Sequence, residues 1–463
     1  MRYTLTFLES QYDELIKHLF GEPDKNEKAA FLLCGLSHTD NELRLLVRGV
    51  IAVPSSDLLS HSPHQLCIPA RSFLPVMKQA DREKAAFCFV HSHPEGFPEH
   101  SEQDDREESA LFRTAYNRIS TAGAVHGSIV ISDPALPRGR IWLDHDGTMP
   151  IDMIRVIGRR FRFYSRPSVD QATHTSFYDR EVRAFGPDIL PLLQKLTIGI
   201  AGAGGTGSPV IEQLIRLGVG RLIIADGQTL EQSNISRVYG SEVDDVGMFK
   251  GALMSRLARH IGLGTHVEIG NRPITFESVL KQFRDCDIVF GCTDDQWGRA
   301  VLSQFSIAYC IPVFDLGVKI DSDNGTIRSI PGRISTLMPG LRCLYCRGQI
   351  TAEGVSAEVI SALSPTEAAE RRRQGYIPEL AEAEPAVIAF TTATAGFAVA
   401  ELLNRLTGYK KDGHGFNEIL IRFDETAIKK PGSKPVPGCF CTKEELIGRG
   451  DRRRFLDQTW RPE

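Results

Sequence analysis

The chain has 463 residues, of which 42% are hydrophobic and 24% charged, which is enough apolar material for two or three globular cores. Its formal net charge of -4 gives no large field of either sign, so composition favours neither nucleic acid nor an anionic membrane as a partner. No segment has the pattern of a secretory signal or a membrane span, and several of the ten cysteines lie within apolar runs, as buried thiols do in a reducing compartment. We therefore expect a multidomain, soluble, cytoplasmic protein.

Residues 1–164 are predicted to form a small α/β domain. Apolar runs predict strands at 3–7, 29–34, 43–50, 85–90 and 128–132. After the first of these strands, apolar residues at helical intervals predict a helix. Ser10 and Asp13 have the spacing of a capping box that would open this helix.

The strand at 85–90 runs into HSHPEGFPEHSEQD, which holds the first group of candidate site residues. Residues two apart in an extended chain share a face, so His91 and His93 can point at one metal ion. Asp104 comes at the start of a predicted helix and can return a carboxylate to the same ion. Two imidazoles and one carboxylate leave a fourth tetrahedral position open for water, as in a catalytic zinc site. A plainer interpretation is that Ser101 and Asp104 form only a capping box and that the histidines are polar loop residues.

The motif H-x-H-P, with Ser101 seven residues after its proline and then Asp104, resembles the JAMM (JAB/MPN) metallopeptidases, which cut isopeptide bonds to ubiquitin-like proteins. The resemblance implies that His91, His93 and Asp104 bind the zinc ion and that Ser101 helps to hold the oxyanion. It also implies a general base, a glutamate just before an early strand that ends in glycine, and Glu27 in NEKAAFLLCG is the counterpart. The alternatives for this role are Glu22 and Glu42.

Residues 165–176 are polar and lack periodicity, which predicts an interdomain linker. Residues 177–428 then alternate strands, among them LTIGIA, RLIIAD, DIVFGCTD and PVFDLG, with helical segments. This alternation predicts a doubly wound, mostly parallel sheet of the Rossmann type. Residues 429–463 are rich in Lys, Pro and Gly, and we expect a loosely structured tail there, apart from a pair of cysteines.

A glycine turn joins the first strand of this second domain to a helix. Its glycines are Gly202, Gly204, Gly205 and Gly207. Such a turn lets the backbone approach a phosphate while the helix N-terminus faces the anion. Asp226, at the end of the next strand, suits a ribose hydroxyl in either an NAD or an ATP site. The turn and this aspartate leave a dehydrogenase open.

Three further residues favour adenylation over hydride transfer: Arg237, Lys250 and Asp294. When a carboxylate attacks the α-phosphate of ATP, the charge of the departing pyrophosphate must be neutralised by cations and Mg²⁺. Hydride transfer has no need of an arginine, a lysine and a strand-end aspartate around the phosphates.

The set GAGGTGS, D-x-x-x-x-E-x-S-N-x-x-R, lysine and CTD, with YDREVRAFG upstream, resembles the ThiF and ubiquitin-activating superfamily over about 250 residues. The resemblance implies that Asp226 holds the ribose and Asp294 the magnesium. It assigns the phosphates to Asn234, Arg237 and Lys250. It also implies a homodimer, in which Arg180 reaches the γ-phosphate of the neighbouring subunit. Gln228 departs from the pattern, because many relatives carry a second acid there.

The cysteines provide one more candidate site. Two tight pairs, Cys343 with Cys346 and Cys439 with Cys441, predict a structural zinc site, with free thiols as the alternative. No cysteine occurs between residues 347 and 438, where relatives that form a thioester carry their nucleophile. We therefore expect the acyl-adenylate to be passed directly to the thiol of a conjugating enzyme or to a sulfur donor.

Two further groups of residues have structural rather than functional interpretations. Cys292 and Cys310 lie in strand contexts and are expected to be buried core thiols rather than nucleophiles. The arginines at 371–373 follow acidic residues and are expected on a solvated helix face rather than on an acidic partner.

Together these features predict a bifunctional enzyme of a bacterial-type ubiquitin-like modification system, which uses ATP, Mg²⁺ and zinc. One domain would adenylate the C-terminal glycine of a ubiquitin-like protein. The other would cleave after that glycine, either to mature the modifier or to remove it from its targets. The first alternative is activation and processing of a sulfur-carrier protein in cofactor or cysteine biosynthesis. The second is a binding scaffold whose catalytic halves have decayed.

Overall fold

The computed structural model describes residues 1–120, 123, 125–144, 147–166, 175–374, 385–411, 416–432, 434–452 and 454–463. The chain divides into two compact units. The first contains Met1–Ser168, Ala308–Cys310 and Glu445–Arg453, and the second contains Val169–Ile307, Ile311–Glu444 and Arg454–Glu463. The predicted linker at 165–176 falls largely on residues 167–174, which lie outside the described residues. No helix in the described part of the chain is long and apolar enough to cross a membrane.

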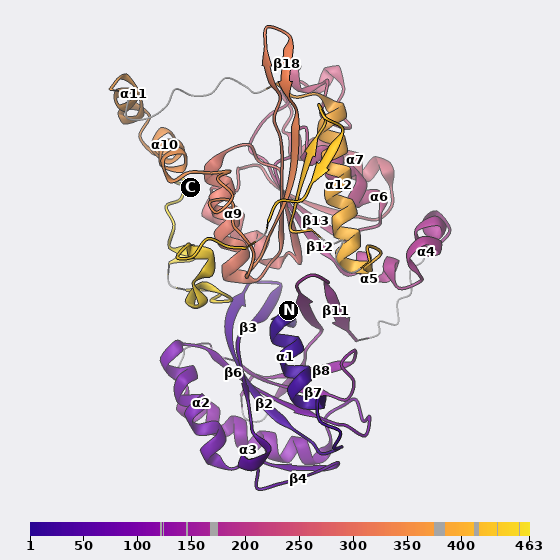
Figure 1. The fold of residues 1–463 in the computed structure, drawn as a ribbon, viewed down its shortest axis with the longest axis vertical. Helices are drawn as coiled ribbons and strands as arrows, with labels where there is room; N and C mark the ends of the chain where they lie inside the picture. Colours follow the sequence, from indigo (N-terminus) through magenta and orange to yellow (C-terminus); the bar gives the residue numbers. More distant parts are fainter. Residues whose placement is uncertain are drawn as a thin grey trace. The chain divides into compact units, whose positions relative to one another are not determined.

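The first unit is a mixed sheet with helices on both faces (Figure 1). Its elements are β1 (Arg2–Leu8), α1 (Glu9–Phe20), β2 (Ala29–His38), β3 (Glu42–Ala52), β4 (Ser60–Ser62), β5 (Gln65–Cys67), α2 (Ala70–Glu83), β6 (Ala86–Ser92), α3 (Glu102–Arg118), β7 (His126–Ile131), β8 (Pro137–Trp142), β9 (Thr148–Pro150), β10 (Met153–Ile157) and β11 (Arg162–Ser165). The strand order of the main sheet is β11-β10-β1-β3-β2-β6-β7-β8-β9, and β4 pairs with β5.

The alternating side chains of β2 explain why both faces of this sheet are covered by helices. Ala30 and Leu32 point into a core completed by Leu15 of α1. The intervening Phe31 points into a second core, which Phe112 of α3 completes together with residues of α2. Successive side chains of a strand face opposite sides, so a continuous apolar run requires both sides to be buried.

The start of α1 differs from the prediction. The helix begins at Glu9, directly after β1, and its N-cap is Leu8. Gln11 Oε1 accepts the Leu8 N–H at 2.9 Å and so takes the capping role. The predicted capping box of Ser10 and Asp13 is therefore wrong, because the strand runs into the helix without an intervening polar turn.

The second unit contains the predicted alternation of strands and helices. Its elements are α4 (Asp179–Phe185), α5 (Ile189–Lys195), β12 (Thr197–Ala201), α6 (Gly207–Arg216), β13 (Arg221–Ala225), α7 (Lys250–Ile261), β14 (His266–Gly270), α8 (Glu277–Gln282), β15 (Ile288–Gly291), α9 (Gln296–Tyr309), β16 (Val313–Val318), β17 (Asp321–Asp323), β18 (Thr326–Ser329), β19 (Pro331–Leu337), α10 (Ala352–Leu363), α11 (Pro365–Arg373), α12 (Ile388–Thr407), β20 (Glu418–Arg422) and β21 (Ala427–Lys429).

The main sheet of this unit has the order β14-β13-β12-β15-β16-β19-β20-β21. Neighbours from β14 to β16 are parallel, and those from β16 to β21 are antiparallel. α9 lies on one face of the sheet, and α6, α7 and α12 lie on the other (Figure 1). The predicted doubly wound, Rossmann-like fold is confirmed. The strand order reverses at β12, so a ligand crevice is expected at the carboxyl ends of β12 and β15.

The tail is more ordered than the composition of 429–463 suggested. In its described residues, short 3-10 helices occur at Phe440–Thr442, Glu444–Leu446 and Phe455–Asp457. Phe455 and Leu456 are buried. These apolar side chains explain why a segment rich in Lys, Pro and Gly still packs against the rest of the chain.

Candidate metal centre and nucleotide site

Three predicted ligands converge at the end of β6 in the first unit. His91 Nε2 lies 3.0 Å from His93 Nε2 and 3.1 Å from Asp104 Oδ1. His93 Nε2 lies 3.5 Å from Asp104 Oδ2. Ligand atoms at about 2.1 Å from one tetrahedral zinc ion lie roughly 3.4 Å apart, so this spacing fits a zinc ion between them. The Nδ1 atom of His93 lies 2.9 Å from the Phe97 carbonyl oxygen, a bond of the kind that orients metal-binding histidines.

The N-terminus of α3 positions the carboxylate. Ser101 is the N-cap, and its Oγ accepts the Asp104 N–H at 3.2 Å. Asp104 Oδ2 accepts the Ser101 N–H at 2.6 Å and also lies near His93, while Oδ1 lies near His91. Burial raises the pKa of Asp104, but the hydrogen bonds from His91 and His93 outweigh it and hold the pKa far below its usual range. Asp104 therefore belongs to both the capping box and the candidate ligand set, so the two interpretations do not exclude each other. The Ser101 hydroxyl keeps its own proton to donate.

Glu27 is the glutamate that the backbone brings to this cluster. β2 pairs with β6 so that Ala29 lies opposite His91, and Glu27 stands two residues before that pair. Its Oε1 lies 4.0 Å from His93 Nε2. The side chain is 7% exposed, and burial raises its pKa against the opposing effect of both histidines. A buried carboxylate with a raised pKa suits proton transfer near neutral pH.

The two alternative glutamates lie elsewhere. Glu22 is largely exposed and pairs with Lys28 at 2.7 Å. Glu42 is buried between Arg44 and Arg155, at 2.6 and 2.8 Å, where the two arginines hold its pKa well below the usual range despite burial. Neither carboxylate contacts the histidines in the described residues.

A second layer behind the metal cluster was not predicted from sequence. Glu108, one turn after Asp104 on α3, is buried and accepts from Ser128, from Arg140 at 2.7 Å and from Trp142 at 3.2 Å. His100 Nε2 lies 3.8 Å from the other oxygen of Glu108. The signal was available, because a residue four positions after a ligand lies on the same helix face. This network ties α3 to β7 and β8 and so fixes the helix that carries Asp104.

In the second unit, the glycine turn packs closely against the end of β15. Gly202 has a φ of 98°, and a Cβ added there would lie 2.7 Å from the Cys292 carbonyl oxygen. A Cβ at Gly207 would lie 1.9 Å from the Gly202 carbonyl oxygen, whereas one at Gly204 would meet open space. Only glycine allows this path, and the open side at Gly204 leaves room for a phosphate above the N-terminus of α6.

Asp226 links this turn to the next loop. Its Oδ2 accepts the Ala203 N–H at 2.7 Å and its Oδ1 accepts the Gln228 N–H at 2.8 Å. Lys250, the first residue of α7, donates from Nζ to Gln228 Oε1 at 2.7 Å. Gln228 thus holds the lysine at the carboxyl end of β13.

Asn234 and Arg237 complete the polar side of the turn. A Cβ at Gly205 would lie 3.2 Å from Arg237 Cδ, so the arginine crosses directly over the glycine. Its Nη1 donates to the Ser233 carbonyl at 2.8 Å. Asn234 is buried, and its Oδ1 has no hydrogen-bond partner among the described residues. These side chains can therefore form further hydrogen bonds with a ligand bound at the turn.

Asp294 and Arg180 are exposed at the surface. Asp294 is exposed just after β15 and forms no hydrogen bond or ion pair with a described residue. Its neighbour Asp295 caps α9 instead, accepting the Gly298 N–H. Arg180 is exposed on α4, and no contact with the described residues links it to the glycine turn.

Glu358 of α10 is a further residue that the sequence did not suggest. Its two oxygens accept the Gln296 and Trp297 N–H groups at 3.0 and 2.8 Å, at the N-terminus of α9. Burial raises its pKa, which these two bonds oppose. The segment after residue 350 is thereby attached beside Asp294.

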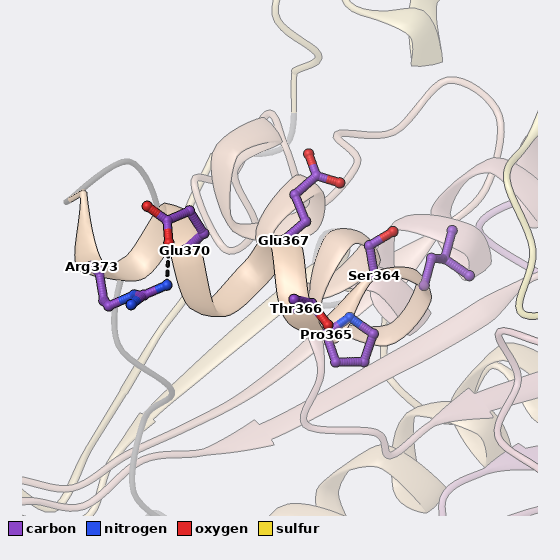
Figure 2. Close-up of a pocket in the computed structure, with 7 residues that line it drawn as sticks. Ser364, Pro365, Thr366, Glu367, Glu370 and Arg373 are labelled. Atoms are coloured by element: carbon purple, nitrogen blue, oxygen red, sulfur yellow. Dashed lines mark hydrogen bonds and ion pairs between the residues drawn. The ribbon is translucent and has the colours of Figure 1, made fainter.

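A hollow of about 770 Å³ lies where α10 meets α11, and Figure 2 shows the residues that line it. Its residues are Leu363, Ser364, Pro365, Thr366, Glu367, Glu370 and Arg373. Arg373 pairs with Glu370 in that view, and Arg371 pairs with Glu367 at 2.6 Å. Arg371 and Arg373 thus pair with acids of their own helix, as on a solvated face, whereas the half-buried Arg372 donates to Ser361 Oγ of α10 at 2.6 Å. The hollow shares no residue with either site.

The four cysteines Cys343, Cys346, Cys439 and Cys441 lie close together. The Sγ atoms of Cys343 and Cys439 lie 3.5 Å apart, and those of Cys346 and Cys441 lie 3.6 Å apart. All four lie within 4.8 Å of one another. Sulfurs at about 2.3 Å from a tetrahedral zinc ion are roughly 3.8 Å apart, so the set fits zinc. A hydrogen bond from Cys343 lowers the pKa of Cys441 to about 5, as suits a thiolate ligand.

Cys292 and Cys310 are poor nucleophiles. Burial raises the pKa of each thiol to about 12. A thiol with so high a pKa is protonated at neutral pH and unreactive.

Comparison with known proteins places both halves in families. The model of the ThiF family matches residues 178–435, more than half of the chain. The model of prokaryotic homologs of the JAB domain matches residues 8–141.

Several curated proteins are similar to the second half. Ubiquitin-like modifier-activating enzyme 5 of Drosophila persimilis is 26% identical over 300 residues, covering 61% of this chain and 71% of that protein. The SAMP-activating enzyme E1 of Haloferax volcanii is 27% identical over 177 residues, covering 38% and 62%. The sulfur carrier protein ThiS adenylyltransferase of Bacillus subtilis is 30% identical over 182 residues, covering 39% and 52%. The match thus spans only about half of the ThiS adenylyltransferase and under two thirds of the SAMP-activating enzyme.

Among solved structures, the crystal structure of E. coli MccB aligns with a TM-score of 0.46 and 18% identity, covering 61% of this chain and 74% of that chain. The chain belongs to the ThiF family and carries, ahead of its ThiF domain, a prokaryotic homologue of the JAB domain.

Proposed function

We propose that this protein uses ATP to adenylate the C-terminal glycine of a ubiquitin-like protein and cleaves the (iso)peptide bond after that same glycine. The observation that carries the proposal is the pairing of two donor sets in one chain. One is the His91, His93 and Asp104 cluster with Glu27 beside it. The other is the glycine turn with Lys250 and its polar neighbours. Peptide-bond cleavage releases a glycine carboxylate, and adenylation consumes one.

In the adenylation half, the residues around the turn bind ATP as a substrate. Asp226 would accept from the ribose, while Asn234, Arg237 and Lys250 would donate to the phosphates. Asp294 would hold Mg²⁺, which neutralises the charge of the departing pyrophosphate. A carboxylate oxygen of the substrate forms a bond to the α-phosphorus, the bond to the β-phosphate oxygen breaks, and an acyl-adenylate and pyrophosphate result.

In the peptidase half, a zinc ion held by the two histidines and the aspartate would make bound water acidic and polarise the scissile carbonyl. Glu27 takes a proton from the attacking water and gives it to the leaving amine. The Ser101 hydroxyl donates to the carbonyl oxygen as negative charge develops on it. The C–N bond breaks, leaving the glycine carboxylate and a free amine.

The acyl group leaves the adenylate for an external acceptor. No cysteine occurs between residues 347 and 438, and the pKa values of Cys292 and Cys310 are raised to about 12. We infer that the thiol of a conjugating enzyme attacks the adenylate directly. We also infer a cytoplasmic setting, from ten free cysteines, and a homodimer, in which Arg180 acts on the neighbouring subunit's ATP.

Pyrophosphate exchange tests the adenylation half. Purified protein is incubated with ATP, Mg²⁺, labelled pyrophosphate and a set of ubiquitin-like proteins that end in glycine. We expect exchange that depends on one of these proteins and is lost in Asp294→Ala. The matched control, Asp323→Ala, removes an exposed carboxylate of β17 and keeps exchange. Absence of exchange with every glycine-ended protein would refute the proposal.

A sulfur-carrier pathway is the second candidate, supported by the similarity to the ThiS adenylyltransferase. There the acceptor would be a sulfur donor, and the activated protein would end in a thiocarboxylate. Mass spectrometry of the activated protein after incubation with sulfide or with a conjugating enzyme separates the two candidates.

A further inference from the structure

A cluster of buried polar side chains lies on β16, and neither proposed site uses it. Asp315 is 1% exposed, and neither carboxylate oxygen has a hydrogen-bond partner among the described residues. Arg299 of α9 brings its Nε to 3.5 Å from Asp315 Oδ2, outside good hydrogen-bond geometry. The Nε atom of Arg333, on β19, also lacks a partner. Buried polar groups nearly always have partners, so a set of unfilled donors and acceptors indicates a binding position.

The cluster offers both donors and acceptors. Arg299 and Arg333 converge over Gly317, where an added Cβ would lie 3.3 and 3.7 Å from their Nη2 atoms. Gln349 is half-buried and donates from Nε2 to Ser335 Oγ of β19 at 3.2 Å, and its Oε1 has no partner among the described residues. Burial lowers the pKa of Arg333 to about 10, so the side chain stays charged at neutral pH. A simple anion would satisfy the arginines but offer no donor to the oxygens of Asp315, whereas a peptide group accepts with its carbonyl and donates with its N–H.

The sheet topology places this cluster across β12 from β13, beside the end of β15. The glycine turn and Asp226 assign the carboxyl ends of β12 and β13 to the nucleotide. β15 lies on the other side of β12, followed by β16. Asp315 pairs with Gly291 at the end of β15, and a Cβ at Gly291 would lie 3.4 Å from Asp315 Oδ2. The next carbonyl, that of Cys292, packs against the glycine turn.

We propose that Asp315, Arg299 and Arg333 form the subsite that binds the last peptide groups of the substrate, behind the carboxylate that is activated. The arginines donate to peptide carbonyls, and Asp315 and Gln349 accept peptide N–H groups. Glycines suit this position because their backbone is accessible from all sides. This inference rests on the proposed adenylation and assigns residues to its protein substrate.

The test measures peptide binding separately from catalysis. A fluorescein-labelled hexapeptide ending in Gly–Gly with a free carboxylate is titrated into the full chain by fluorescence anisotropy, with a non-hydrolysable ATP analogue present. We expect Arg333→Ala and Asp315→Asn each to weaken binding about tenfold or more, as loss of a charged hydrogen bond does. Arg328→Ala, which removes an exposed arginine of β18, is the matched control and should bind the peptide like the parent.

Binding of a fluorescent ATP analogue shows that each variant is folded. Arg333 is half-buried, so its truncation is expected to leave ATP binding intact even if Asp315→Asn does not. Unchanged peptide binding in a folded Arg333→Ala, or no binding by the parent, overturns the subsite. The proposed function fails separately, by absence of pyrophosphate exchange in the parent. If Arg333→Ala catalyses pyrophosphate exchange with an unaltered KM for the protein substrate, the subsite is wrong but the proposed function stands.

Discussion

His126, at the start of β7, is a histidine that the fold keeps neutral. Burial lowers its pKa from 6.5 to about 4. Its Nδ1 accepts the Phe87 N–H at 3.2 Å, and its ring packs against Phe112 and Tyr116. Between these two pKa values the unfolded chain binds a proton that the folded chain does not. This residue therefore contributes stability above about pH 6.5, and the contribution is lost as the pH falls toward 4.

We predict that His126→Gln reduces the acid sensitivity of the first unit, because glutamine can still accept from Phe87 but does not ionise. As the pH falls from 6.5 to 4, the parent should lose about 3 kcal/mol more of its free energy of unfolding than the variant does. Urea unfolding of the full chain, followed by pulse proteolysis at each pH, measures it. His64→Gln, at an exposed histidine, is the control. Parallel stability curves for the parent and His126→Gln would contradict the prediction.

Single residues also show how far a sequence can predict a site. His91, His93 and Asp104 were found because a metal site needs particular residue types at particular spacings, and the structure brings them together. Their roles remain predictions. Asp315 was overlooked, although an acid in the apolar run PVFDLG is itself a signal. Its partners, Arg299 and Arg333, come from other elements, and only the fold shows that they meet.

At the scale of elements, the cysteine pairs join the chain after β19 to the start of the tail. Val436 donates its N–H to Cys346 Sγ at 3.4 Å, and the Phe440 ring packs edge-on against Tyr345. Metal ligation by all four thiols would fix this junction more firmly than these contacts do, because it closes a long loop.

We predict one zinc ion at this cluster and one at the histidine cluster. His91→Ala should lose the first-unit zinc and peptidase activity but keep pyrophosphate exchange. Cys441→Ser should lose the other zinc, keep that of the first unit, and expose the tail to limited proteolysis. Inductively coupled plasma mass spectrometry of the purified proteins measures the number of zinc ions per chain. A variant with the metal content of the parent would show that its cluster does not bind zinc.

Elements differed in how well the sequence predicted them. The strands of the parallel sheet are long apolar runs bounded by glycine turns, and their pattern is strong. β8 to β11 were not predicted, since sequences such as PRGRIW carry little alternation and become strands only through pairing with neighbours. The start of α1 was misplaced for a similar reason, because Gln11 rather than Ser10 caps it.

For the whole molecule, the ThiF family and the JAB-type domain follow from local motifs, and the family models confirm both. The strand order of the first sheet could not be predicted, because it depends on long-range pairing such as β1 with β10. We propose that the two sites act in series, with the peptidase site releasing the glycine carboxylate that the adenylation site activates. Glu27 and the glycine turn would then act one after the other on the same substrate.

The most direct test uses a ubiquitin-like precursor with residues beyond its terminal glycine, incubated with ATP and Mg²⁺ and followed by mass spectrometry. We predict that the parent trims the precursor and then forms the adenylate on the new glycine. Glu27→Gln should leave the precursor uncut and unadenylated, although it adenylates the mature form normally. Glu22→Gln, the matched control, should behave like the parent. Adenylation of the uncut precursor, or trimming by Glu27→Gln at the parental rate, would contradict the account.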